Sequence, residues 1–341
     1  MTSLLWLRYI LIRSLLILIV LETFVLSWNL WIDPLWLHTN EHSWNNRQYG
    51  FDERKQKMNR LIHTEKAYDS IIIGSSRSTF IDPEDFESLN VFNFSASSMQ
   101  PQEYKGYIAA AQNKLGESLK TVYLGVDFQS TNMDRESQYP SPELYEKNAR
   151  SYLWTLRDLL SLDTVEVSNK VARSSLSDQN QFPGIRYYNR NGVAFPKPVN
   201  KRMRAEYIEE AENSIKNDRY EYDTSIRSLY VELKEAFPGI QFVVFTTPVS
   251  SVRLDMLSGS TAYQNGFENW MKDLVDIFGE VHHFMNKNSI TEDPNSFYDS
   301  QHMYPSVASK LTNALQYPER VTDDFGVVVN KSNLSYFLKI Q

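Results

Sequence analysis

From about residue 68 onward, short apolar runs alternate with longer amphipathic stretches. The apolar runs predict strands at 68–73, 91–94, 121–126, 241–246 and 280–284. The amphipathic stretches predict helices at 102–115, about 203–236, 262–278 and 305–317. Strand and helix in alternation at this spacing are typical of a mostly parallel sheet with helices on both faces. We therefore expect a three-layer α/β domain over residues 68–320, with ligands at the carboxyl ends of its strands.

The first 33 residues differ from the rest and predict a membrane anchor. From Ser14 to Ile32 the chain has 19 residues, of which 14 are apolar. Such a stretch is just long enough for a helix that crosses a hydrocarbon core of about 30 Å. Arg8 and Arg13 precede it, so the positive-inside rule leaves the N-terminus in the cytoplasm and exports the rest.

Three tryptophans, at positions 28, 31 and 36, would then lie in the outer interface as an aromatic belt. Glu22 is costly inside a span, and it either faces a partner helix or is tolerated near the outer third. A cleaved signal peptide is the rival interpretation, although no small-residue cleavage site follows the apolar run. A buried core or interfacial helix is the third.

Three further segments complete the organisation. Residues 34–67 are polar and irregular, with a helix over about 52–63, and form a connector. Residues 128–202 break the alternation and are rich in Tyr, Arg and Asn. We interpret them as an insertion lying over the strand ends, where such side chains suit sugars and protein contacts equally. Residues 321–341 remain as a C-terminal tail.

Composition narrows the chemistry. The formal charge of −7 argues against a general binder of DNA or RNA. The chain has no cysteine, which excludes disulfides, thiolate catalysis and Cys-ligated zinc. The adjacent His282 and His283 would point to opposite faces of their strand, so they do not share an ion easily. We expect no metal and no cofactor.

Two motifs carry candidate chemistry. Gly74 and Ser75–Ser76–Arg77 follow the first buried strand, where a serine is exposed at the carboxyl end. Asp299 and His302, three residues apart, precede the last amphipathic helix. His302 could take the proton of a serine hydroxyl while Asp299 fixes the tautomer of the imidazole. The alternative is structural: Ser76 a turn residue and His302 a packing residue at a helix start.

Together these motifs resemble the SGNH (GDSL-like) hydrolase superfamily over residues 68–316. Gly74–Ser75–Ser76 stands where that family has Gly-Asp-Ser, and Asp299–Ser300–Gln301–His302 matches its D-x-x-H. The resemblance implies a flavodoxin-like fold with Ser76 as nucleophile, His302 as base and Asp299 as orienting acid. The anchor and the GSSR motif look most like membrane-tethered members of polysaccharide O-acylation pathways, which work beside a membrane-bound O-acyltransferase.

The second and third family blocks depart from the pattern. The run containing Asn93, Ala96 and Ser97 has no glycine where the family places one, and Asp127 stands where the family has asparagine. An ionised carboxylate would repel the oxyanion, and losing one donor costs about 10²–10³ in rate. Asp127 is therefore protonated, or turned away while another donor serves, or the site is weak. Asn93, Arg77, Gln129 and a backbone N–H of Ala96 or Ser97 are the candidate donors.

For Arg77 two roles stay open, holding a carboxylate of an acceptor glycan or bracing the sheet edge. Ser75, which replaces the family aspartate, makes the assignment of the nucleophile less secure. We count it, with Arg77, Asn93, Ser97 and Asp127, among the candidate oxyanion or substrate-binding residues.

We therefore expect a serine acyl-ester enzyme in the bacterial cytoplasmic membrane, with its domain in the periplasm or outside. It would transfer an acyl group, such as acetyl, to a sugar hydroxyl of an envelope or exported polysaccharide. Two alternatives remain: an esterase of envelope glycans, and a non-catalytic scaffold in a polysaccharide-assembly complex. Its partners would be the glycan, the membrane and a membrane-bound O-acyltransferase, with no nucleic acid.

Overall fold

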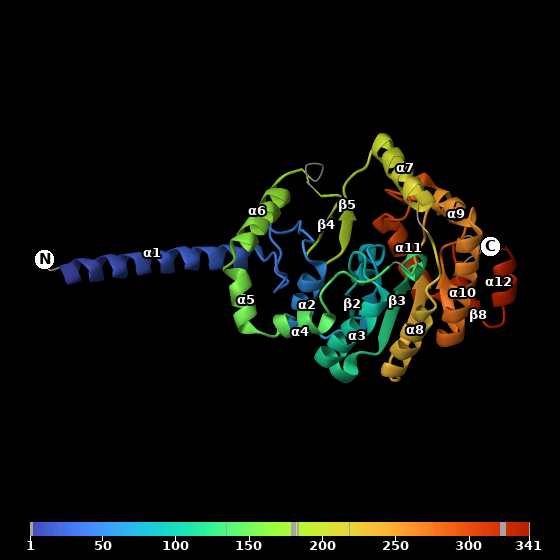
Figure 1. The fold of residues 1–341 in the computed structure, drawn as a ribbon, viewed down its shortest axis with the longest axis horizontal. Helices are drawn as coiled ribbons and strands as arrows, with labels where there is room; N and C mark the ends of the chain where they lie inside the picture. Colours follow the sequence, from blue (N-terminus) through green and yellow to red (C-terminus); the bar gives the residue numbers. More distant parts are fainter. Residues whose placement is uncertain are drawn as a thin grey trace.

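The computed structural model shows an α/β domain built on a six-stranded sheet, with one long helix projecting from it (Figure 1). It describes residues 3–133, 135–178, 182, 184–217, 219–320 and 325–340. The sheet order is β2-β1-β3-β6-β7-β8, parallel from β2 to β7, with β8 antiparallel at the edge. Its strands are β1 Ser70–Ile73, β2 Val91–Asn93, β3 Thr121–Val126, β6 Gln241–Thr246, β7 Glu280–His283 and β8 Val327–Asn330. The five predicted strands are confirmed to within two residues at each end.

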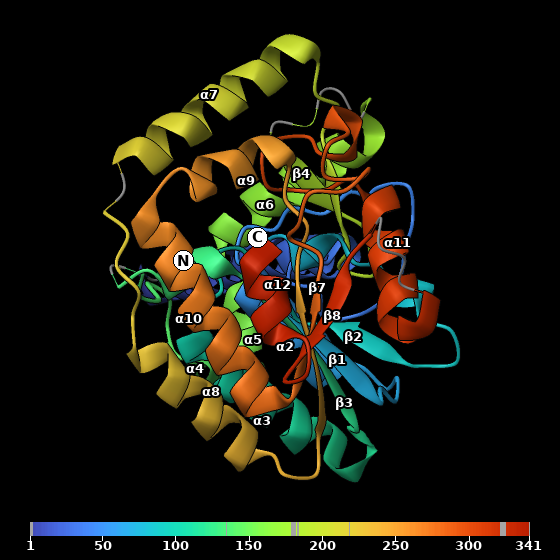
Figure 2. The same ribbon diagram turned by 90° about the vertical axis from the view of Figure 1, so that its right-hand side faces the viewer.

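Helices cover both faces of the sheet, as Figure 2 shows with α8 and α10 on one side and α11 on the other. The helices are α1 Ser3–Ile32, α2 Glu53–His63, α3 Pro101–Leu115, α4 Pro142–Ala149, α5 Tyr152–Leu159, α6 Leu162–Leu176, α7 Lys201–Asn217, α8 Ser225–Ala236, α9 Ser251–Ser258, α10 Thr261–Phe278, α11 Pro305–Gln316 and α12 Leu334–Ile340. A small antiparallel hairpin, β4 Arg186–Tyr188 and β5 Ala194–Pro196, lies outside the main sheet. The expected α/β architecture is confirmed.

Alternation along the strands explains why the sheet needs both helical layers. On β1, Ile71 and Ile73 enter the core beneath α3, α8 and α10, whereas Ile72 enters the core beneath α11. All three are fully buried. A strand with apolar side chains on both faces is stable only in a sheet covered on both sides, and this is the environment of parallel strands.

Helix α1 carries a 29-residue apolar segment, Leu4–Ile32, whose most apolar stretch is not buried against the domain. Its length and composition fit a single membrane span or a signal sequence. Its last turn belongs to the domain. Asn29 is fully buried, donates to Leu159 O over 2.7 Å and accepts a hydrogen bond from the hydroxyl of Ser168. Ile32 packs with Val171.

The structure corrects the placement of Trp36. We expected it in an aromatic belt at the membrane, but it is 1% exposed and packs edge-on against Tyr188. Its indole N–H donates to Gln48 Oε1 over 3.1 Å. The chain turns back after α1, so residue 36 lies inside the domain. The expected connector is therefore largely packed structure. Its helix α2 lies where a helix was predicted, and the side chain of Asp52 caps it by accepting the backbone N–H of Lys55.

Other segments also differ from expectation. The predicted helix over 203–236 is two helices, α7 and α8, because the chain between them pairs Tyr222 with Asn132 and packs Tyr220 on Tyr263. Of the residues expected to form a C-terminal tail, 321–324 and 341 lie outside the description. Among the others, 327–330 form β8 and 334–340 form α12, with Phe337 buried.

The predicted insertion, 128–202, divides between two places. Its hairpin β4–β5 contacts the turn after β1, whereas its helices α5 and α6 lie against α1 (Figure 1).

Two glycines let the ends of β1 and β3 close around one side chain. A Cβ on Gly74 would lie 2.4 Å from Ser78 Oγ and 3.0 Å from Gly125 O. A Cβ on Gly125 would also lie 2.4 Å from Ser78 Oγ. Both distances are far inside van der Waals contact, so the turn that follows β1 requires glycine at each position.

We predict that Gly74→Ala lowers the free energy of unfolding by about 1–3 kcal/mol, the usual cost of overpacking a well-filled site. Gly239→Ala is the matched control, because nothing lies within 4 Å of its Cβ position, and we expect a change below about 0.5 kcal/mol there. Urea unfolding followed by tryptophan fluorescence measures both. Equal stability of the two variants would contradict the packing argument.

Candidate active site

Ser76 lies in the tight turn that follows β1. The backbone N–H of Ser78 donates to Ser75 O over 3.1 Å, and that of Thr79 donates to Ser76 O over 3.3 Å. These bonds start the 3-10 turn η1 Ser78–Phe80 directly at the end of the strand. Ser76 is half-buried while both its neighbours are buried. Its hydroxyl is therefore fixed by the turn and still accessible.

His302 reaches this serine from the other end of the chain. Its Nε2 lies 2.8 Å from Ser76 Oγ, although the residues are 226 positions apart. Its Nδ1 lies 2.6 Å from Asp299 Oδ2. Asp299 Oδ1 also accepts the backbone N–H groups of Gln301 and His302, which fixes the carboxylate as well as the ring. The three side chains thus form one continuous hydrogen-bonded relay.

The surroundings of the imidazole support this geometry. The ring of Tyr298 stacks on His302 with an interplanar angle of 12° and a centroid distance of 5.3 Å, and Phe80 packs nearby. Burial works to raise the pKa of Asp299, but the interactions with His302 and the two backbone N–H groups outweigh it and leave the pKa below its ordinary value. Asp299 is therefore a carboxylate at neutral pH, able to stabilise a positively charged imidazole.

The carboxylate of Asp127 is paired with a buried cation and is not left uncompensated beside the serine. Its Oδ1 lies 2.9 Å from Arg77 Nη1 and accepts a hydrogen bond of 3.2 Å from Thr247. Arg77 Nη2 in turn donates to Gln129 Oε1 over 2.8 Å and to Gln301 Oε1 over 3.1 Å. The ion pair compensates the carboxylate. Of the two roles open for Arg77, these contacts match the brace between strand ends.

A second buried arginine stands beside this pair. Arg253, on α9, is 3% exposed, and its Nη1 lies 3.4 Å from Ser300 Oγ. Burial, reinforced by the positive charge of Arg77, lowers the pKa of Arg253 to about 10. It remains a cation at neutral pH, so two guanidinium groups face the carboxylates of Asp127 and Asp299. Two buried positive charges therefore balance the two carboxylates beside the relay.

Several of the expected oxyanion donors are engaged elsewhere. The amide nitrogen of Asn93 donates to Ser78 O and Ile81 O, both over 2.9 Å. The backbone N–H of Ala96 donates to Gly74 O, and that of Ser97 donates to Glu53. These hydrogen bonds hold residues 93–97 in place, and the three N–H donors are therefore already occupied. Of the named alternatives, Arg77 and Gln129 lie together near the relay.

Ser75 is buried, and its hydroxyl accepts the backbone N–H of Arg77 over 3.4 Å. It therefore supports the turn in which Ser76 stands.

Sequence reasoning missed several residues of the site. Gln301 was seen only as an intervening residue of the D-x-x-H motif, Tyr298 only as its neighbour, and Arg253 and Glu53 not at all. The proximity of Gln301 and Tyr298 to His302 was the one available signal. Arg253 and Glu53 depend on tertiary packing, and Glu53 pairs with Arg186 of hairpin β4–β5. Burial works to raise the pKa of Glu53, but Arg186 and Ser97 lower it to about 2.

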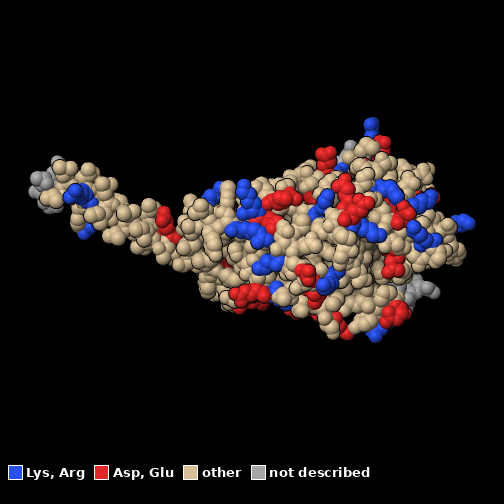
Figure 3. Space-filling view, turned by 90° about the horizontal axis from the view of Figure 1, so that it is seen from below, with Lys and Arg blue, Asp and Glu red and all other residues tan. Residues whose placement is uncertain are grey.

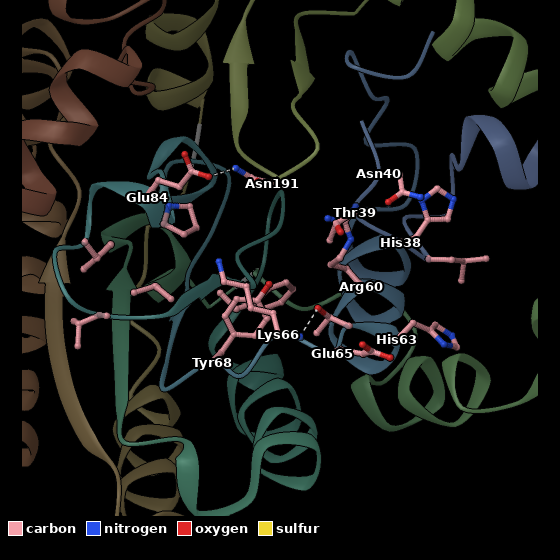
Figure 4. A pocket seen from close by; sticks show the side chains of 17 residues that line it. His38, Thr39, Asn40, Arg60, His63, Glu65, Lys66, Tyr68, Glu84 and Asn191 are labelled. Atoms are coloured by element: carbon pink, nitrogen blue, oxygen red, sulfur yellow. Dashed lines mark hydrogen bonds between the residues drawn. The ribbon is translucent and has the colours of Figure 1, made fainter. Parts of the chain in front are cut away.

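A separate cavity of about 670 Å³ lies beyond the β2 edge of the sheet and contains no member of the relay (Figure 4). Its wall includes His38, Arg60, Tyr68, Glu84 and Asn191, and the last two are hydrogen-bonded to each other. Within the described ranges, no group of three His, Asp or Glu side chains is arranged to hold a metal ion.

Comparison with known proteins gives no further guide, because no family model and no curated protein matches the chain. The fold and the geometry of this site are therefore the basis for assigning a function.

We predict strong coupling between Arg77 and Asp127, since both are nearly fully buried. Removing either charge alone, by Asp127→Asn or Arg77→Met, should cost about 3–5 kcal/mol of unfolding free energy because it leaves the other uncompensated. The double variant should lose clearly less than the sum. Chemical denaturation of the four proteins measures the cycle. Additive losses would show that the two residues do not depend on each other.

Proposed function

We propose that this protein is a membrane-anchored serine acyl-ester enzyme of the SGNH type that transfers an acyl group to a sugar hydroxyl of a cell-envelope or exported polysaccharide. One observation carries the proposal. The relay Ser76–His302–Asp299, with hydrogen-bonding distances of 2.8 and 2.6 Å, joins a strand-end turn to a loop more than two hundred residues later. A nucleophile, a base and an orienting acid in this order define serine acyl chemistry.

In the proposed reaction, His302 Nε2 takes the hydroxyl proton of Ser76 as Oγ attacks the carbonyl carbon of the acyl donor. Asp299, which accepts the Nδ1–H of the ring, stabilises the imidazolium that forms. The tetrahedral intermediate expels its alcohol, which receives the proton from His302, and an acyl-serine remains. An acceptor hydroxyl then gives its proton to His302 as its oxygen attacks the acyl carbon. The second tetrahedral intermediate collapses, the bond from the acyl carbon to Ser76 Oγ breaks, and His302 returns the proton to Oγ as the product ester departs.

The negative charge of the tetrahedral intermediate needs donors. The backbone N–H of Ser76 is one by position, as in other strand-end nucleophiles. The guanidinium group of Arg77, which is held by Asp127, Gln129 and Gln301 and follows Ser76 directly in the chain, is the further candidate donor. Because Arg77 already neutralises Asp127, the substitution of the family asparagine by aspartate is compatible with an oxyanion.

The anchor supports action at a membrane. α1 carries Arg8 and Arg13 near its start, which favours an exported domain. Asn29 and Ile32 at its end are buried in the domain, so removal of the helix as a signal peptide would take packed residues with it. We therefore favour a retained single span in the bacterial cytoplasmic membrane, with the domain in the periplasm or outside the cell.

Transfer rather than hydrolysis is favoured by the anchor and by the resemblance to membrane-tethered O-acylation proteins, which work with a membrane-bound O-acyltransferase. An esterase would use the same relay, with water as acceptor. A non-catalytic scaffold gains some support from the occupied donors at Asn93 and Ser97. The direct hydrogen bond between Ser76 and His302 argues against it, because a degenerate site has no need to keep that geometry.

The test uses the full chain in lipid nanodiscs, p-nitrophenyl acetate as donor and an added oligosaccharide as acceptor, with products followed by mass spectrometry. We predict acetylated oligosaccharide in excess over free acetate, and a loss of about 10⁴-fold or more in rate for Ser76→Ala and for His302→Ala.

The control is Ser332→Ala, a surface serine beyond β8, whose activity should be unchanged. Free acetate alone would favour the esterase. Equal rates in the wild type and in Ser76→Ala would contradict both enzyme hypotheses and support the non-catalytic scaffold.

A further inference from the structure

Helix α5 and the start of α6 expose an unusual amount of apolar surface. Tyr152 is 90% exposed, Leu153 80% and Leu162 77%, and Leu156 is exposed as well. These four residues are called the α5–α6 apolar face below. Isolated exposed apolar residues are common, but several together on adjoining helices mark a contact surface.

This face is fixed to the end of α1. Asn29 in the last turn of α1 donates to Leu159 O at the end of α5 and accepts from Ser168 on α6, each over 2.7 Å. Ile32 packs with Val171 and Ala172 of α6. Because these contacts are buried, α5 and α6 cannot swing away from the end of the apolar helix. Figure 1 shows both helices at the end of the domain from which α1 departs.

The residues around this junction are those that favour a membrane interface. Trp28, Trp31 and Trp44 pack together at the end of α1, and the guanidinium group of Arg157 stacks on the ring of Trp154, 3.9 Å from its centroid. Tryptophan is enriched where the hydrocarbon core meets the headgroups, and arginine side chains near the ends of membrane helices extend to the same interface. In Figure 3 the surface next to the entry of α1 is largely tan, and patches of Lys and Arg, interspersed with Asp and Glu, begin further along the domain.

We propose that the α5–α6 apolar face lies in the lipid interface, as a second membrane contact beside α1. The inference rests on the proposed membrane anchorage and extends it. A single helix would leave the domain free to tilt, whereas a second contact rigidly joined to its end fixes the orientation of the domain on the bilayer. The relay is then held at a constant height above the membrane, where an acyl donor delivered from the bilayer arrives.

The absence of cysteine makes a direct test possible. Leu153→Cys and Leu162→Cys each carry one environment-sensitive fluorophore on the full chain, at one chain per nanodisc. Tyr336→Cys is the matched control, since this aromatic is 69% exposed on α12, at the opposite end of the domain in Figure 1. Discs with and without brominated lipid are compared, because bromine quenches only fluorophores that reach the acyl chains.

We expect brominated lipid to lower the emission at positions 153 and 162 by about two-fold and to leave position 336 unchanged, as for side chains buried about 5–10 Å into the interface. No quenching at 153 and 162 would overturn the proposal. If the two fluorophores are shielded from water only when a disc holds two chains, the proposal is overturned in favour of self-association. Running the same labels on Ser76→Ala separates the two claims, because loss of the acyl chemistry leaves the quenching pattern intact.

Discussion

The hydrogen bond between Ser76 Oγ and His302 Nε2 is the constraint on which the account of this protein depends. The bond forms because β1 is followed by a tight turn that requires Gly74, and because the loop before α11 brings His302 to the same edge of the sheet. Parallel strands direct their carboxyl ends to one side, so residues from both ends of the chain meet there. Asp299 and Tyr298 then fix the imidazole in the orientation that the serine requires.

Electrostatics around this bond are set by buried pairs. Arg77 and Arg253 bring two positive charges close to the carboxylates of Asp127 and Asp299, and Gln129 and Gln301 accept further hydrogen bonds from Arg77. Such an arrangement is costly to break and holds the ends of β1, β3 and β6 together. The two positive charges balance the two carboxylates, so Asp127 adds no uncompensated negative charge near the relay.

Much of the fold followed from the pattern of the sequence, because strands buried on both faces are continuous apolar runs and their helices are amphipathic. β3 and β6 were located to the residue. The pairing of Ser76 with His302 and Asp299 was also foreseeable, since strand ends and the residues before α11 converge in this architecture. The burial of Trp36 was not foreseeable, because it depends on the chain turning back after α1, and such a turn leaves no periodic signal in the sequence. The role of Asp127 depended on Arg77, a partner fifty residues away that spacing alone does not reveal.

The central claim is that the hydroxyl of Ser76 is an activated nucleophile. The most direct measurement is to incubate the full chain with a serine-directed fluorophosphonate and to locate the adduct by peptide mass spectrometry. We expect one adduct, on Ser76, formed much more slowly in His302→Ala and in Asp299→Asn. An unlabelled protein, or an adduct that forms at the same rate without His302, would contradict it.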